Sequence, residues 1–383
     1  SENIVPGWMR HYHGKSGMTF VDLVFPAFLF IVGMSIPFAL GSRLAKGEPL
    51  SRIVFHVITR VLALLLIGIM MVNGSPNSGA MGWSGTLWSV LMHLSAILGF
   101  CALSPRPMAA GTYANAKIWR GISWGLRGLG LIGLILLAFA FRGENDRRII
   151  TLSPFSVHTS WYGILGLIGW AYLVGSVDFL VFRTNRTALL GCMTLLFCLY
   201  PAARNGAFEH FWLAHYVGIG GTLGSQAAIT VGGLLLASIL ITTKTADVRQ
   251  RTRFALLFVT ACSAGALLLH PLYGINKNSA TPSWCLWACA ITAALWLVFH
   301  LIADVHPVGF ITTPLAIAGQ NVLLAYLISE MLPSLLNLLH LGSWYSRLAE
   351  PNLACAIARS AGCAVLILVL TAVLNRFGFR LRL

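Results

Sequence analysis

Residues 17–40 read GMTFVDLVFPAFLFIVGMSIPFAL, an apolar run long enough to cross a lipid bilayer as one helix. Asp22 is the one charged residue in this run. Similar runs recur to the end of the chain, and they lack the alternating apolar and polar pattern of a membrane β-barrel strand. The sequence therefore predicts an all-α integral membrane protein, a polytopic bundle of about 11 transmembrane helices that forms one domain over residues 1–383.

Composition supports this class. Of the 383 residues, 57% are hydrophobic and 10% are charged, whereas a soluble domain is typically about a quarter charged. The mean hydropathy is +0.79. We expect spans at 20–41, 53–73, 84–104, 119–141, 160–182, 187–204, 219–242, 253–271, 283–303, 312–337 and 353–375.

The formal charge of +15 reports membrane orientation and not nucleic-acid binding, because the basic residues lie in short loops between apolar runs. With the start of the chain outside the cytoplasm, fifteen basic residues face inward and eight face outward. The inward set is Arg43, Lys46, Arg52, Arg106, Lys117, Arg120, Arg183, Arg186, Lys244, Arg249, Arg251, Arg253, Arg376, Arg380 and Arg382. This bias predicts an outer N-terminal segment and a cytoplasmic C-terminus.

The first residues, SENIVPGWM, have no apolar region of the kind that a signal peptide contains. An outer N-terminal segment normally needs a preceding helix to carry it across the membrane. We therefore expect one N-terminal helix to be missing from this sequence.

All eight cysteines lie in or beside apolar segments, which is typical of packing residues. Cys285 and Cys289 are four residues apart but have no second His or Cys pair to complete a zinc site. The sequence predicts neither disulfides nor a bound metal.

The segment RHYHGKSGMTFVD, residues 10–22, places titratable groups at the mouth of the first span. A histidine can take a proton or carry an acyl group near neutral pH, and a carboxylate can hold its ring in one tautomer. A pair made by His11 or His13 with Asp22 would fit this chemistry, and a charge inside a span needs a partner. Alternatively, the histidines are interfacial anchors and Asp22 caps the helix that begins beside it.

The segment GINKNSATPSW, residues 274–284, lies between two predicted spans. Asn276 and Asn278 could donate hydrogen bonds to a carbonyl or developing oxyanion, and Lys277 suits a phosphate or thioester oxygen. Thr281 followed by Pro282 predicts a helix start. The alternative is a polar turn with a lysine that extends to the membrane surface.

Charged residues within the spans need partners in the bilayer. We expect pairing of the type Arg60–Asp178 to meet this need, as a structural and not a functional feature. We also treat 312–337 as one long span, with Asn321 and Glu330 on different faces.

The run at 17–40 resembles the signature of the heparan-α-glucosaminide N-acetyltransferase family, and more closely that of its bacterial relatives associated with N-acetylglucosamine use. Three further stretches match in order, SWYGILGLIGWAYLV (160–174), PLYGINKNSATPSWCLWACAI (271–291) and PLAIAGQNVLLAYLISEML (314–332). The first core helix of the family, with an Asp-Arg-Gly run, has no counterpart here. The resemblance spans nearly the whole chain, and its first and third stretches are the specific ones.

The resemblance implies a membrane acetyltransferase that moves an acetyl group from cytoplasmic acetyl-CoA to a terminal glucosamine amine on the far side. It implies His11 as the active residue, although a one-residue gap would substitute His13, with Asp22 as its partner. The loop of Asn276, Lys277 and Asn278 matches the family's Ile-Asn-Lys element, and we expect these residues to stabilise the thioester oxyanion or position the donor. A bacterial inner-membrane location, with the first residues periplasmic, and a homodimer are further implications.

The expected donor binds at the cytoplasmic face while His11 faces the other side. A pantetheine arm of roughly twenty ångströms would cover much of a hydrocarbon core of about 30 Å. We therefore expect a channel between helices.

Two other functions compete. A transporter for amino sugars or their oligomers would also use many spans and charges inside the membrane. A structural membrane subunit would leave the His, Asp and Lys residues unexplained. Histidines gathered at one mouth favour the acyltransferase, because transporter sites lie near the bilayer midplane.

Overall fold

The computed structural model describes residues 5–73, 76–103, 116–153, 155–159, 161–242, 248–305 and 309–383. The chain forms two compact units. The first contains Leu66–Gly163 and Gly309–Leu383, and the second contains Pro6–Leu65 and Ile164–Val308. Each unit is therefore assembled from segments that are distant in the sequence.

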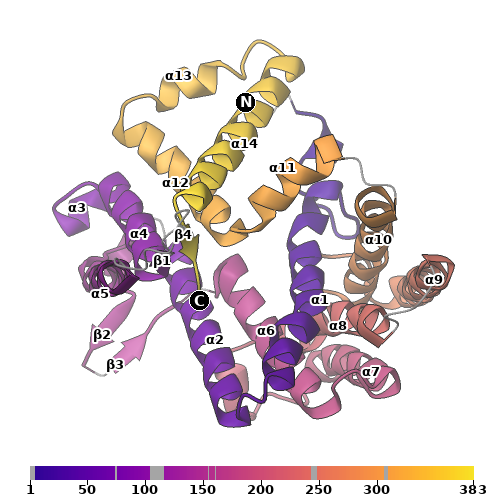
Figure 1. The fold of residues 1–383 in the computed structure, drawn as a ribbon. Helices are drawn as coiled ribbons and strands as arrows, with labels where there is room; N and C mark the ends of the chain where they lie inside the picture. Colours follow the sequence, from indigo (N-terminus) through magenta and orange to yellow (C-terminus); the bar gives the residue numbers. More distant parts are fainter. Residues whose placement is uncertain are drawn as a thin grey trace. The chain divides into compact units, whose positions relative to one another are not determined.

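The second unit carries the segments singled out above, at 10–22 and 274–284 (Figure 1). Its long helices are α1 (Val24–Ala45), the first part of α2 (Leu50–Val72), α6 (Gly163–Phe182), α7 (Arg186–Arg204), α8 (Ala227–Thr242), α9 (Val248–Tyr273) and α10 (Pro282–His300). Shorter turns are η1 (Gly7–Met9), η2 (Phe20–Leu23), η4 (Trp212–His215), and the π-helices η5 (Ile219–Gln226) and η6 (Leu301–Val305).

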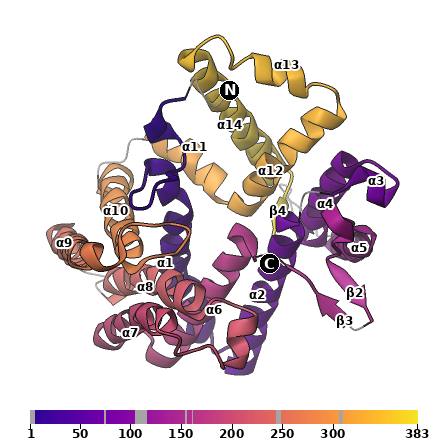
Figure 2. The same ribbon diagram turned by 180° about the vertical axis from the view of Figure 1, so that it is seen from behind.

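Helix α8 is the centre of this unit, in contact with α1, α7, α9 and α10. Figures 1 and 2 show α1, α8 and α10 side by side. A Cβ atom at Gly33 of α1 would overlap the carbonyl oxygen of Thr230, and one at Gly233 of α8 would overlap the carbonyl oxygen of Phe30. The two glycines therefore let the α1 and α8 backbones touch, as small residues do between membrane helices.

The first unit contains the remaining elements. Its helices are α3 (Ser78–Met81), α4 (Gly85–Gly99), α5 (Ala116–Ala140), η3 (Glu144–Asp146), α11 (Gly309–Gly319), α12 (Val322–Leu338), α13 (Gly342–Arg347) and α14 (Leu353–Arg376). Two short antiparallel ribbons join β1 (Cys101–Leu103) to β4 (Phe379–Leu381) and β2 (Ile150–Leu152) to β3 (Phe155–Val157).

The prediction of a polytopic all-α membrane protein is confirmed. Nine helices in the described part of the chain are long and apolar enough to span a bilayer, and α4 and α12 are shorter apolar helices. These correspond to the eleven expected spans, with shifts of a few residues at most ends.

Two predicted spans were wrong in extent. The 84–104 span ends as a helix at Gly99, because the chain then forms strand β1. The 312–337 span is broken between α11 and α12 at Gln320 and Asn321. The Asn321 amide donates to the Phe379 carbonyl at 3.2 Å and accepts from the Leu381 N–H at 3.1 Å, so this residue binds strand β4 instead of continuing the helix.

The expected Arg60–Asp178 pair was also wrong. Among the ion pairs between described residues, none joins these two. The Arg60 guanidinium instead lies over the Tyr172 ring, 4.7 Å from its centroid. An aromatic face attracts a cation in a dry environment, so it takes the place of the carboxylate that we had expected.

We predict that Gly33→Ala destabilises the second unit by about 1–3 kcal/mol, because the added methyl group overpacks the α1–α8 contact. Gly41→Ala in the same helix is the matched control, since its Cβ would make an ordinary 3.7 Å contact with Phe179. Thermal unfolding of the purified protein in detergent measures the difference. Equal melting temperatures for the two variants would contradict the contact.

Candidate functional site

The segment before α1 is held against the start of that helix. The Thr19 hydroxyl donates to the Arg10 carbonyl at 2.6 Å. A Cβ atom at Gly14 or Gly17 would lie within 2.6 Å of the Tyr12 ring, so the ring packs directly on backbone there. These contacts fold residues 10–19 into a compact arch that returns His11 to the helix start.

One oxygen of Asp22 organises this arch. Oδ2 accepts the Thr19 N–H at 3.1 Å and the Tyr12 N–H at 3.0 Å. Thr19 and Asp22 form a capping box at the start of η2. Thr19 is the N-cap residue, and the Asp22 carboxylate accepts the hydrogen bond from its backbone N–H. The capping role that the sequence suggested for Asp22 is therefore present.

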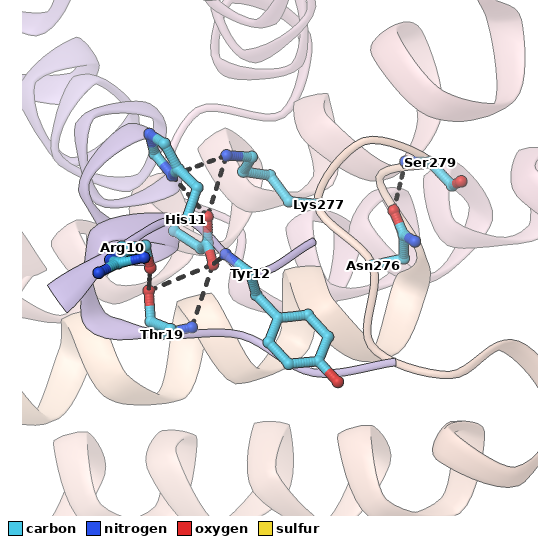
Figure 3. A network of polar contacts seen from close by, with 8 residues as sticks. Arg10, His11, Tyr12, Thr19, Asn276, Lys277 and Ser279 are labelled. Carbon is cyan, nitrogen blue, oxygen red and sulfur yellow. Dashed lines mark hydrogen bonds and ion pairs between the residues drawn. The ribbon is translucent and has the colours of Figure 1, made fainter. Parts of the chain in front are cut away.

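The other oxygen of Asp22 binds two side chains (Figure 3). Oδ1 lies 2.8 Å from Nδ1 of His11 and 2.9 Å from Nζ of Lys277. The same Nζ is 2.9 Å from Nδ1 of His11, so the three groups form a triangle. Asp22 is 1% exposed, whereas the side chains of His11 and Lys277 are 53% and 28% exposed. The carboxylate is buried and its partners reach the surface.

Nδ1 of His11 faces an acceptor and a donor in this triangle, the Asp22 carboxylate and the Lys277 ammonium. A hydrogen on Nδ1 is donated to Oδ1, whereas an unprotonated Nδ1 accepts from Lys277. In both arrangements Lys277 also lies within hydrogen-bonding distance of Oδ1. The site thus provides a half-exposed imidazole that is held at Nδ1, with Nε2 on the side of the ring away from Asp22.

Lys277 reaches the triangle because its loop is bonded to the N-terminal arch. The Gly17 N–H donates to the Ile275 carbonyl at 2.8 Å, and the Ile275 N–H donates to the Ser16 hydroxyl at 3.0 Å. Gly274 has φ +64°, in the left-handed region that favours glycine, where the chain leaves α9. The Thr281 hydroxyl closes the loop by donating to the Gly274 carbonyl at 3.0 Å.

The structure brings together three of the five residues that the sequence singled out: His11, Asp22 and Lys277. Asn276 holds its own loop, because its side-chain oxygen accepts the Ser279 N–H at 3.0 Å (Figure 3). Asn278 is exposed on the same loop. His13 is exposed, and the Asp22 contact is made by His11.

Sequence reasoning missed the backbone donors of Thr19 and Tyr12. The Thr-x-x-Asp spacing at 19–22 is the capping-box signal that could have revealed the first of them. The Tyr12 contact has no local signal, because it depends on how the arch folds back.

A second histidine and aspartate meet at the other end of α10. Nδ1 of His300 lies 2.6 Å from Oδ2 of Asp304, and the ring is stacked on Trp296. These residues are four apart on one helical stretch, and the ring is buried. The pair joins no distant segments and presents no exposed nitrogen, so His11 is the better candidate. The described residues contain no group of three His, Cys, Asp or Glu side chains that could hold a metal ion.

Comparisons with known proteins match part of the chain. A protein-family profile described as "Domain of unknown function (DUF5009)" matches residues 2–104. Heparan-alpha-glucosaminide N-acetyltransferase of Mus musculus is 33% identical over 76 residues, and that of Homo sapiens is 36% identical over the same length. Each alignment covers 20% of this chain and 12% of the relative. The resemblance noted from the sequence is confirmed over this limited length.

We predict that Asp22→Ala destabilises the protein more than Asp22→Asn does. Alanine leaves two backbone N–H groups without their acceptor, at about 1–3 kcal/mol for each group that stays buried, whereas asparagine keeps one side-chain oxygen. Thermal unfolding in detergent ranks the stabilities of the two variants. Glu350→Ala is the control, because Glu350 is exposed and takes part in none of the ion pairs found between described residues. An Asp22→Ala variant as stable as the wild type would disprove the capping role.

Proposed function

We propose that this protein is a membrane acyltransferase that moves an acetyl group from acetyl-CoA to the amine of an amino sugar. One observation carries the proposal: a half-exposed His11 ring is oriented by the buried Asp22 carboxylate at one end of a helical membrane unit. The similarity to the two N-acetyltransferases agrees with this chemistry. We assign the site to the non-cytoplasmic side, because the basic loops favour that orientation.

His11 acts through Nε2 in either of two routes. In direct transfer, the amine attacks the thioester carbon while Nε2 takes the amine proton; the C–S bond then breaks and the thiolate leaves. In the two-step route, Nε2 itself attacks, the N–C bond forms, and the C–S bond breaks. A neutral amine then displaces the imidazole and its proton goes to the released ring nitrogen. Asp22 stabilises the positive charge that develops on the ring in both routes.

Lys277 has a different proposed role from the one that its sequence neighbourhood suggested. Its Nζ is 2.9 Å from the Asp22 carboxylate, so its charge is directed at the pair and not at an open position. We propose that it holds Asp22 ionised and fixed in place. Asn278, which is exposed on the same loop, is the proposed donor-side contact, and Asn276 supports it by shaping the loop. The pantetheine channel stays a prediction.

We expect His11→Ala to lower acetyl transfer to glucosamine at least 100-fold, because a positioned acid or base contributes about 10²–10⁴-fold. His13→Ala is the matched control and should keep the activity, since the Asp22 contact belongs to His11. Transfer is measured with radiolabelled acetyl-CoA and the purified protein in vesicles. Full activity in His11→Ala, or a loss of activity in His13→Ala alone, would contradict the assignment of His11 as the acting residue. Mass spectrometry after labelled acetyl-CoA alone separates the routes, because only the two-step route leaves the label on His11.

We expect Lys277→Gln to lower kcat about tenfold and leave the KM for acetyl-CoA nearly unchanged, since Nζ contacts Asp22. Asn278→Ala should do the opposite and raise this KM. Steady-state kinetics with acetyl-CoA as the varied substrate distinguishes the two. A raised KM with unchanged kcat in Lys277→Gln would assign the lysine to donor binding instead.

A further inference from the structure

A cavity with a mixed polar and apolar lining lies beside the loop that carries Lys277. Its volume is about 480 Å³, within the range of ligand sites. It is lined by Tyr200, Ala203 and Arg204 at the end of α7, by Gly218–Gly221 before and within η5, and by Ser279 of the loop. Ser279 is two residues from Lys277 and donates its N–H to Asn276. The cavity and the His11 site therefore share one loop.

Arg204 gives this cavity its charge. The guanidinium is exposed, and none of the ion pairs found between described residues involves it. A guanidinium binds phosphate or carboxylate with two parallel hydrogen bonds. The cavity is thus suited to an anionic group attached to a polar molecule.

An apolar groove of about 480 Å³ lies next to this cavity. It runs between α7, α9 and the start of α10, and its lining includes Leu190, Met193, Phe197, Phe258 and Leu269. The groove and the cavity adjoin at Tyr200 and Tyr273, whose rings meet edge to face with centroids 5.5 Å apart. An apolar groove and an exposed arginine thus lie at the same end of the unit.

The chemistry of the groove favours a lipid chain over the arm of the acyl donor. A pantetheine arm carries two amides, which need hydrogen-bond partners when they are removed from water. The groove lining is almost entirely hydrocarbon and sulfur, whereas a hydrocarbon chain needs no such partners. Leu190, Cys198 and Ala261 line the groove and are exposed on helices long enough to span a bilayer, so a chain can enter from the membrane.

We propose that the acceptor is an amino sugar attached to a phosphate-bearing lipid. Its hydrocarbon chain lies in the groove of α7, α9 and α10, its phosphate binds Arg204, and its sugar extends along the Ser279 loop towards His11. The proposal rests on the function proposed above. It adds the substrate class: a lipid-anchored amino sugar and not a free one.

The test is a binding measurement that needs no acetyl transfer. The probes are glucosamine linked to a polyprenyl phosphate, free glucosamine, and dioleoylphosphatidylglycerol, each titrated into the purified protein in detergent and followed by native mass spectrometry. We expect the lipid-linked sugar to bind at least about tenfold more tightly than the free sugar. Arg204→Ala should weaken its binding about tenfold, as the loss of a charge-assisted contact does, and Arg204→Lys should restore part of it.

Two further variants test where the hydrocarbon chain binds and control for the loss of a positive charge. Ala261→Trp fills the groove and should also weaken binding of the lipid-linked sugar. Arg253→Ala removes an exposed arginine near the opposite end of α9 and should leave it unchanged. Equal affinity for free and lipid-linked glucosamine, or no effect of Arg204→Ala, would overturn the proposal. Dioleoylphosphatidylglycerol that binds as tightly, with the same dependence on Arg204, would overturn the acceptor assignment in favour of a bulk-lipid site.

The same probes separate this proposal from the proposed function. If the lipid-linked sugar binds through Arg204 but receives no acetyl group from acetyl-CoA, the lipid site stands and the acyltransferase function fails. If free glucosamine is acetylated through His11 as efficiently as the lipid-linked sugar, the function stands and the lipid site fails.

Discussion

The Asp22 carboxylate is the interaction on which the candidate site depends. Burying a carboxylate costs free energy unless its oxygens accept hydrogen bonds. In Asp22 each of the two oxygens has its own set of donors. Oδ2 accepts two backbone N–H groups and fixes the fold of the N-terminal arch, while Oδ1 binds His11 and Lys277. The helix cap and the chemical pair are thus properties of one side chain.

This arrangement requires two segments more than 250 residues apart to meet, as the separation of 255 between Asp22 and Lys277 shows. The packing of the membrane helices brings these two segments together. Gly33 and Gly233 let α1 and α8 touch, and α10 packs against both. Because α1 begins and α9 leads into α10 at the same end, the arch and the Lys277 loop are close enough for backbone hydrogen bonds. Helix packing therefore supplies the precision that a loop alone would lack.

The surroundings of the site have two different characters. The triangle of His11, Asp22 and Lys277 is compact and charged, whereas the neighbouring surface combines an arginine-lined cavity with a hydrocarbon groove. A free sugar would leave the groove without an occupant that matches it. A substrate that is polar at one end and apolar at the other would use both, which is why the proposed substrate class rests on these surroundings and not on the triangle itself.

Much of the fold was predictable from sequence because apolar length and composition decide whether a helix spans a bilayer. The failures are local. Asn321 breaks a predicted span because its amide binds strand β4, and Arg60 lies on Tyr172 instead of pairing with Asp178. Both depend on contacts between elements, which an apolar pattern along one segment does not contain.

The sequence by itself determined the membrane class, the helix start at Thr19–Asp22 and the residue types available for chemistry at each loop. Only the tertiary structure decided that His11 and not His13 contacts Asp22, that Lys277 completes the pair, and that Arg204 lies beside the same loop. The physical reason is the distance along the sequence over which each interaction acts. Hydrophobic length and capping act over a few neighbouring residues, whereas a buried carboxylate selects its partners from whatever the packed helices bring within hydrogen-bonding distance.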